Sequence, residues 1–185
     1  MSTRSYIAMK TGENTYRVVY CHYDGYPEYN GRMLLEHYNT QERVKKLLDL
    51  GCISSLHEKL EPEAGSHHCF DTPDKYVTVF YGRDRGEKGQ EAFTCTEEQL
   101  KDPRSWICYI YVFDNETWYF SQIERNGFSE FQPLAPAIQK INERRNRNET
   151  WHYSTEREGD RDHETYGHLC ALYYGLSGTA QRLLL

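Results

Sequence analysis

Two pairs of strand-like segments, each joined by a short turn, most constrain what this chain can fold into. Residues 4–10 alternate between apolar and polar side chains, and residues 15–22 are rich in β-forming residues. The intervening Thr11-Gly12-Glu13-Asn14 has the composition of a turn. Residues 106–113 and 117–122 flank Asp114-Asn115-Glu116 in the same way. The sequence therefore predicts two β-hairpins.

An amphipathic helix is predicted over residues 41–50. Thr40 offers an N-cap side chain, and Val44, Leu47 and Leu48 follow the spacing of one helix face. Gly51 then supplies the residue type that commonly follows the last turn of a helix.

The remaining segments carry weaker patterns of helix, strand and loop. We expect a helix that leaves the loop at 23–30 and runs to about Tyr38. Residues 97–101 follow Thr96 as a short capped helix, and residues 133–145 place Leu134, Ala137, Ile138 and Ile141 on one helix face. Three further segments are predicted as a loop at 52–74, a strand at 75–81 and a charged, glycine-bearing connection at 82–89.

This order of elements predicts an α+β fold, with a mainly antiparallel sheet built from β-hairpins and helices packed on one side. We expect one α+β domain over residues 1–142. Residues 143–164 are dominated by charges and predict an exposed loop or a helix extension. Residues 165–185 predict a C-terminal helical segment that packs on the domain.

Aromatic side chains compensate for a low apolar content. Only 38% of the 185 residues are hydrophobic and the mean hydropathy is -0.86, but 16 Tyr and seven Phe can build a core. Tyrosine also suits protein interfaces, where the ring is buried and the phenol stays hydrated.

The net charge of -6 argues against direct binding to the nucleic-acid backbone, because proteins that bind it normally carry an excess of basic residues. Arg144-Arg145-Asn146-Arg147, near Trp151 and Tyr153, is interpreted as a solvated charged face because acidic residues follow it. An acidic surface can instead dock on a basic groove of a protein that handles nucleic acid.

We expect a protein of the cytoplasm. The first residues contain one Arg and no apolar segment of the kind found in secretory signals, and no apolar run approaches the roughly 20 residues of a membrane span. Six Cys lie far apart, without a CxxC pair, and are predicted to be free thiols, at positions 21, 52, 69, 95, 108 and 170.

The stretch from Val19 to Gly31 is the candidate functional region, because a strand there leads into a polar, aromatic loop. Its candidate binding residues carry phenol, imidazole and carboxylate groups: Tyr20, His22, Tyr23, Asp24, Tyr26 and Tyr29. Arg83 and Arg85, between glycines after a predicted strand, are added because guanidinium groups bind phosphate and carboxylate well.

The chain resembles a family of small phage and prophage proteins without an assigned activity. The resemblance rests on the opening Met1-Ser2-Thr3-Arg4-Ser5-Tyr6-Ile7-Ala8, on Tyr20-Cys21-His22-Tyr23-Asp24-Gly25-Tyr26-Pro27, on Leu34-Leu35-Glu36-His37-Tyr38 and on Tyr81-Gly82-Arg83-Asp84-Arg85-Gly86. It covers roughly the first half of the chain. It implies a mobile-element origin and a bacterial cytoplasm, and it supplies no catalytic residues.

Two clusters of residues are candidates for a metal site or for a catalytic Cys–His pair. These are Cys21-His22 with Asp24, and His67-His68-Cys69 with Asp71. Neither has the ligand spacing of a structural zinc site, and neighbouring strand residues point to opposite faces. Adjacent Cys and His rarely form a catalytic dyad, so the sequence predicts no catalytic residue, no metal ligand and no cofactor.

Three functions remain open on these residues. The leading hypothesis is a phage-derived, non-enzymatic accessory protein that binds and inhibits a bacterial macromolecule, most naturally a nucleic-acid-handling defence effector such as a CRISPR nuclease. One alternative is a binding protein, or sponge, for a nucleotide signal that uses Tyr20, His22, Asp24, Arg83 and Arg85. Another is a metal-dependent hydrolase. The sequence does not determine the oligomeric state.

Overall fold

The computed structural model describes residues 2–153, and the side chains of residues 2–145. The chain divides into two units, residues 1–145 and residues 146–185. The predicted C-terminal segment 165–185 lies outside the described residues.

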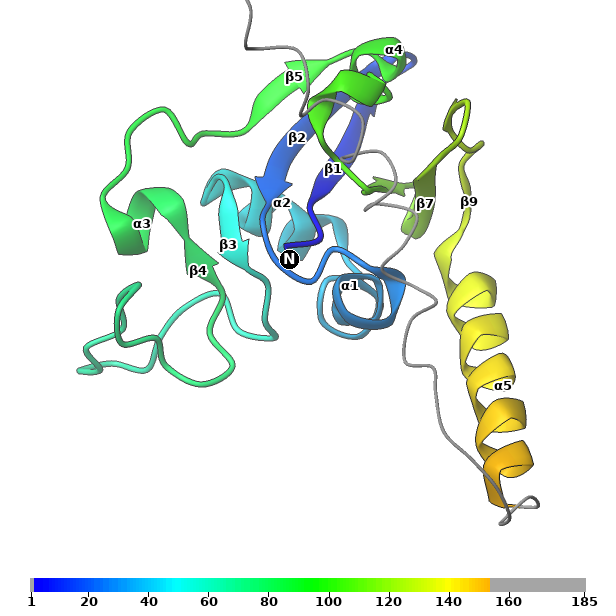
Figure 1. Ribbon diagram of the computed structural model, residues 1–185. Helices are drawn as coiled ribbons and strands as arrows, with labels where there is room; N and C mark the ends of the chain where they lie inside the picture. Colours follow the sequence, from blue (N-terminus) through cyan, green and yellow to red (C-terminus); the bar gives the residue numbers. More distant parts are fainter. Residues whose placement is uncertain (1, 154–185) are drawn as a thin grey trace, which may run out of the picture. The chain divides into compact units, whose positions relative to one another are not determined.

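Nine strands within residues 2–153 form one mixed sheet (Figure 1). In chain order they are β1 (Ser5–Gly12), β2 (Thr15–Cys21), β3 (Ile53–Ser55), β4 (Val79–Phe80), β5 (Phe93–Cys95), β6 (Tyr109–Asp114), β7 (Thr117–Glu124), β8 (Gly127–Phe128) and β9 (Gln132–Pro133). Their order across the sheet is β4-β3-β2-β1-β6-β7-β8, with β5 paired to β2 and β9 paired to β7. The pairs β1–β6 and β2–β3 are parallel and the others antiparallel.

The helices of the described residues are mostly short. They are α1 (Arg32–His37), α2 (Gln41–Asp49), α3 (Tyr81–Arg85), α4 (Glu97–Leu100) and α5 (Leu134–Tyr153), with a π-helical turn at Pro27–Gly31 and a 3-10 turn at Pro103–Ser105. With the mainly antiparallel sheet, they confirm the predicted α+β class.

Both predicted hairpins are present. In β1–β2 the register pairs Ser5 with Cys21 and shifts between Lys10 and Gly12. In β6–β7 the turn residues Asn115 and Glu116 have φ angles of 46° and 58°. Two successive left-handed residues match the twist of antiparallel strands, which explains how a turn of this length closes the hairpin.

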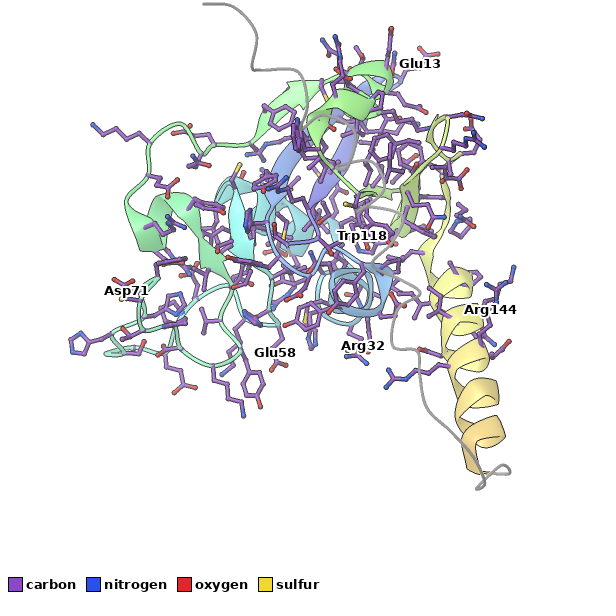
Figure 2. All side chains as sticks on the ribbon, in the orientation of Figure 1. Glu13, Arg32, Glu58, Asp71, Trp118 and Arg144 are labelled. Carbon is purple, nitrogen blue, oxygen red and sulfur yellow. The ribbon has the colours of Figure 1, made fainter. Side chains whose placement is uncertain are left out.

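Alternate side chains of the central strands point to opposite faces of the sheet and belong to two separate buried clusters. Ile7 and Val19 face one cluster, to which α1, α2 and α5 also contribute apolar side chains. Trp118 belongs to this cluster and lies inside the domain (Figure 2). Ala8 and Val18 face the other cluster, which Leu100 of α4 helps to cover. Three helices thus pack on one side, as predicted, and the short α4 adds to the opposite side.

Helix α2 follows the predicted capping pattern. The Thr40 hydroxyl accepts a hydrogen bond from the Arg43 backbone N–H at 3.4 Å, and Gly51 has a φ of +87° just beyond the helix. A Cβ at Gly51 would lie 2.3 Å from the carbonyl oxygen of Gln90. Glycine is therefore required here by both its φ angle and its contact.

The segment from 52 to 89 differs from the prediction. Ile53–Ser55 forms a strand inside the predicted loop, and the predicted strand 75–81 is reduced to Val79–Phe80. Tyr76 has a φ of 69°, which breaks the extended run. The charged connection begins as helix α3, because the Asp84 carboxylate accepts the Phe80 backbone N–H at 2.7 Å.

Helix α5 covers the predicted helix at 133–145 and continues to Tyr153. The first part of the charged segment 143–164 is therefore helical, and its remainder lies outside the described residues. None of the helices between residues 2 and 153 combines the length and the apolar character that a membrane crossing requires.

Candidate functional site

A buried amide fixes the loop that follows β2. Asn30 is fully buried, and its Nδ2 donates to the Cys21 sulfur at 3.3 Å, to the Ser5 hydroxyl at 3.3 Å and to the Tyr23 carbonyl at 3.2 Å. These bonds join the start of β1, the end of β2 and the loop. The loop is thereby tied to the sheet at both of its ends.

A close backbone approach fixes the middle of the same loop. The Gly25 N–H donates to the Thr3 carbonyl at 2.8 Å, and the Tyr111 hydroxyl donates to the Gly25 carbonyl at 2.8 Å. A Cβ at Gly25 would lie 2.8 Å from the Thr3 oxygen and 2.9 Å from the Arg4 carbonyl carbon. Only glycine fits this contact without a backbone shift.

Cys21 serves the core and does not form a pair with His22. Its side chain is buried in the cluster that α1 and α2 cover, and burial raises the pKa of its thiol to about 12. The thiol therefore stays protonated at neutral pH and is a poor nucleophile. His22 is the next residue in the chain and lies beside Tyr20 instead.

Five rings and one guanidinium group form a continuous band on the sheet side where Tyr20 lies, and we call it the cationic strip. Its members are Phe70, Arg85, Tyr81, Tyr20, His22 and Tyr23. Along the band, the Arg85 guanidinium lies 4.1 Å from the Phe70 ring centre and 5.0 Å from that of Tyr81. The other rings follow at 6.4 Å from Tyr81 to Tyr20, 5.9 Å from Tyr20 to His22 and 4.4 Å from His22 to Tyr23.

Arg4 adds a second cation to the strip. The β1–β2 register pairs Ser5 with Cys21, so Arg4 precedes β1 beside the point where His22 follows β2. Burial lowers the pKa of His22, and the charges of Arg4 and Arg85 lower it further. Burial raises the pKa of Tyr20 to about 12, against the opposing effect of Arg4. Both rings are therefore neutral at pH 7.

A second group of rings follows in the loop, and we call it the acidic ring cluster. It comprises Asp24, Tyr26, Glu28, Tyr29, His57 and Glu58. The Tyr26 and Tyr29 ring centres lie 6.3 Å apart, and the Tyr29 hydroxyl lies 3.1 Å from Nδ1 of His57. In Figure 2, Glu58 projects outward at the margin of the domain.

Carboxylates act on the two tyrosines of the acidic ring cluster. The pKa of Tyr26 is raised by burial, then by the nearby carboxylate of Asp24 and then by Glu28. The pKa of Tyr29 is raised by burial and by Asp24, and Arg32 opposes this in smaller measure. The sequence-predicted residues thus separate into two neighbouring surfaces of opposite charge, which adjoin between Tyr23 and Asp24.

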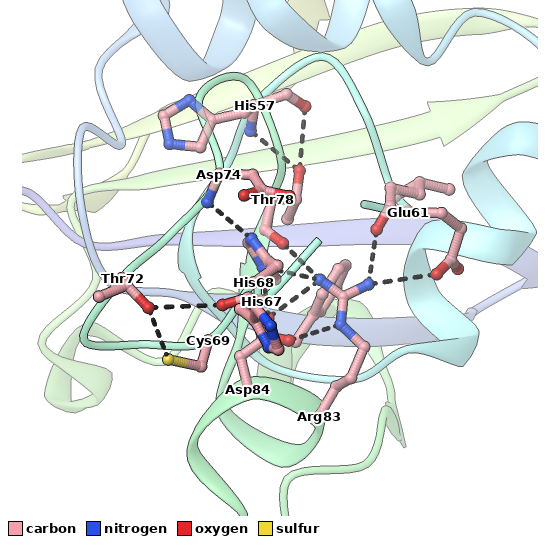
Figure 3. A network of polar contacts seen from close by, with 12 residues as sticks. His57, Glu61, His67, His68, Cys69, Thr72, Asp74, Thr78, Arg83 and Asp84 are labelled. Atoms are coloured by element: carbon pink, nitrogen blue, oxygen red, sulfur yellow. Dashed lines mark hydrogen bonds and ion pairs between the residues drawn. The ribbon is translucent and has the colours of Figure 1, made fainter. Parts of the chain in front are cut away.

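Arg83 belongs to neither surface. Its guanidinium donates to the Leu60 carbonyl at 2.6 Å, to the Thr78 carbonyl at 2.8 Å and to the Asp84 carboxylate at 2.6 Å (Figure 3). The His68 side chain lies 3.3 Å from the same carboxylate. The His68 and Asp84 side chains are 1% and 3% exposed, so this network holds the loop 56–78 against α3. The structure therefore separates Arg83 from Arg85, with which the sequence grouped it.

The second sequence cluster is also used internally. His68 accepts the Asp74 backbone N–H at 3.0 Å, and the Cys69 sulfur lies 3.1 Å from the Thr72 hydroxyl. Within the described residues, no group of three or more His, Cys, Asp or Glu side chains is placed so that it could hold a metal ion. The hydrolase alternative therefore finds no assembled ligand set between residues 2 and 145.

Six residues of the two surfaces were not among the candidates from the sequence: Arg4, Glu28, His57, Glu58, Phe70 and Tyr81. The hairpin register carried a signal for Arg4, since pairing across the turn at 11–14 brings the residue before β1 next to His22. Glu28 lies within the candidate stretch 19–31, and the other four come from the 52–89 segment, whose structure the sequence did not reveal. The chain matches no family model, no curated protein and no solved structure.

Proposed function

We propose that this chain is a phage-derived accessory protein that binds and inhibits a bacterial macromolecule in the cytoplasm of its host. The target class that fits best is a nucleic-acid-handling defence effector, such as a CRISPR nuclease. The phage origin is supported by the resemblance of the N-terminal half. The mode of action is supported by the acidic ring cluster.

The observation that carries the proposal is an exposed ring beside carboxylates without cationic partners. Tyr26 is 37% exposed, and neither Asp24 nor Glu28 forms an ion pair with a side chain described between residues 2 and 145. Aromatic side chains dominate the binding energy of many protein interfaces. Carboxylates around such rings complement the basic grooves that hold nucleic acid in nucleases.

The fixed backbone of the loop after β2 also supports the proposal. The contacts of Asn30 and Gly25 hold the backbone on both sides of Asp24, and Tyr29 is bonded to His57. A surface that is already ordered loses little conformational entropy when it binds. The loop therefore presents Tyr26 and Glu28 as a rigid ligand for a complementary groove.

The proposal is tested with matched pairs of variants. Tyr26→Ala is compared with Phe93→Ala, because Phe93 is a similarly exposed ring on β5. Glu28→Lys is compared with Glu98→Lys, because Glu98 is an exposed carboxylate on α4. Each protein is used to capture partners from lysate of a bacterium that carries defence nucleases, and the captured protein is then purified and assayed for nucleic-acid cleavage.

We expect the wild type and both control variants to capture one nucleic-acid-binding protein and to inhibit its activity. Tyr26→Ala and Glu28→Lys should each weaken inhibition at least tenfold, which corresponds to about 1.4 kcal/mol of binding energy. Equal inhibition by all five proteins, or capture without inhibition, contradicts the proposal.

A further inference from the structure

We propose that the imidazole of His68 is an acid-sensitive switch, which holds residues 67–74 closed on helix α3 while it is neutral and releases them when it takes a second proton. We call these residues the 67–74 turn. The turn carries Phe70, so its release also detaches this ring from the cationic strip. The proposal goes beyond the inhibitor function and does not depend on it.

The hydrogen bonds of His68 fix the position of its proton. The Asp74 backbone N–H can only donate, and it donates to Nδ1 at 3.0 Å, so Nδ1 carries no proton. The proton of the neutral ring is then on Nε2, which lies 3.3 Å from Oδ2 of Asp84 and 3.2 Å from Nη2 of Arg83 (Figure 3). Arg83 has only N–H groups, so the Nε2 proton is directed to Asp84.

These bonds close the turn on α3. The His68 and Asp84 side chains are 1% and 3% exposed. The Phe70 backbone N–H donates to the Asp84 carbonyl at 3.2 Å, and the Phe70 ring centre lies 4.1 Å from the Arg85 guanidinium. The imidazole of His68 therefore joins Asp74, at the end of the turn, to α3.

A second proton on His68 does not fit this arrangement. Nδ1–H would face the Asp74 N–H across 3.0 Å, which places two donors together without an acceptor. The imidazolium would also lie 3.2 Å from the Arg83 guanidinium, which is a second cation. The Asp84 carboxylate attracts the imidazolium, but it already accepts from Arg83 at 2.6 Å and from the Phe80 N–H at 2.7 Å. The charged ring is therefore better solvated by water in an open turn.

The other charged groups of the loop 56–78 do not reverse this balance. Glu61 is directed to the Arg83 guanidinium, at 3.5 Å. Asp74 contacts the ring of His68 through its backbone N–H. The pKa of His57 is lowered by burial and, in smaller measure, by His68, so the two imidazoles oppose each other's charge.

Nuclear magnetic resonance of the full chain at pH 7.5 and pH 5 tests the switch, because histidine ordinarily changes its charge within this range. At pH 7.5 the ¹⁵N shifts of His68 should show a protonated Nε2 and an unprotonated Nδ1. At pH 5 both nitrogens should carry protons, and the close contacts between the Phe70 ring and Arg85 should be lost.

Hydrogen exchange measures the opening of the turn. Between pH 7.5 and pH 5 the protection factor of the Asp74 N–H, corrected for the intrinsic effect of pH on exchange, should fall at least tenfold more than that of the Trp118 indole N–H. The indole is buried and donates to the Tyr38 carbonyl at 2.7 Å, so it reports on unfolding of the whole domain.

His68→Asn separates the switch from a general effect of acid. The asparagine oxygen can take the place of Nδ1 as the acceptor of the Asp74 N–H, but it does not titrate. This variant should keep the same protection at Asp74 at both pH values. His67→Asn, at the exposed neighbouring histidine, is the matched control and should lose protection as the wild type does. Thermal unfolding establishes that each variant is folded.

Four results would overturn the proposal. One is a proton on Nδ1 of His68 at pH 7.5, and another is a ring that stays neutral at pH 5. The third is a doubly protonated ring at pH 5 with the Asp74 N–H as protected as at pH 7.5. The fourth is an equal loss of protection in His68→Asn and the wild type. Failure here leaves the inhibitor proposal untouched, because its variants lie in the acidic ring cluster.

Discussion

The residues at the end of β2 and in the loop after it have two roles: some hold the loop backbone in place, and others are exposed at the surface. Cys21, Gly25 and Asn30 are buried and hold the backbone, whereas Tyr23 and Tyr26 are exposed. The residues that give this stretch its distinctive sequence therefore have two different physical roles. A substitution at a supporting residue should lower stability, and one at a surface residue should lower binding alone.

Asn30→Ala should lower the free energy of unfolding by about 2 kcal/mol. The change removes three hydrogen bonds and leaves the Tyr23 carbonyl and the buried Ser5 hydroxyl without this donor. Urea denaturation followed by circular dichroism measures the effect. Gln139→Ala, at an exposed position of α5, should change stability by less than about 0.5 kcal/mol. Equal effects of the two substitutions would show that the amide does not support the loop.

His57 should make the domain less stable as the pH falls from 7 toward 5. Burial lowers its pKa from the ordinary value of 6.5, although Asp24 and Glu58 oppose this. Below pH 6.5 the unfolded chain therefore binds the proton more readily than the folded chain, and the free energy of unfolding decreases. Above pH 7 both states are neutral and His57 contributes no pH dependence.

His57→Gln isolates this contribution, because glutamine keeps a polar group near the Tyr29 hydroxyl and does not titrate. Urea denaturation at pH 5, 6, 7 and 8 should show a smaller loss of stability for the variant than for the wild type. A parallel pH dependence in both proteins would contradict the lowered pKa.

At the scale of elements, local patterns predicted the parts of the fold that local interactions form. Helix α2 has its cap, its apolar face and its terminal glycine within residues 40–51, and the β1–β2 hairpin has its turn between its strands. The β3–β4 pair was missed because it joins a three-residue strand to a two-residue strand. Helix α3 was missed because the bond from Phe80 to Asp84 cannot be read from residue types alone.

In the candidate site, too, the residues that are neighbours in the sequence were predicted and those that depend on distant segments were not. Tyr20, His22 and Tyr23 could be grouped from the sequence because they are neighbours at the end of one strand. Arg83 and Arg85 could not be told apart, because their directions depend on α3. Arg85 turns toward Tyr81, while Arg83 turns toward Leu60 and Thr78.

Asp84→Ala should loosen this element and lower the free energy of unfolding by about 3 kcal/mol. The substitution removes the carboxylate that holds Arg83 and the Phe80 N–H, and it leaves the almost fully buried His68 side chain without this partner. Urea denaturation gives the stability, and limited proteolysis reports on the loop 56–78. Glu42→Ala, at an exposed ion pair with Lys46, is the matched control and should leave both readouts almost unchanged. Loss of stability without faster cleavage in 56–78 would contradict the assigned role.

At the scale of the molecule, the net charge of -6 conceals a local division of charge. The charges of Arg4 and Arg85 act on His22 and those of Asp24 and Glu28 act on Tyr26, although only three residues lie between His22 and Tyr26 in the sequence. The net charge alone would have predicted only the acidic surface.

The most direct measurement for the inhibitor proposal places a photo-crosslinking phenylalanine analogue at position 26 and, as the control, at position 93, in bacterial cells that carry a defence nuclease. The account predicts a covalent adduct between the nuclease and position 26, at residues that line its nucleic-acid groove, and none at position 93. An adduct at position 93 alone, or adducts of equal yield at both positions, would contradict it.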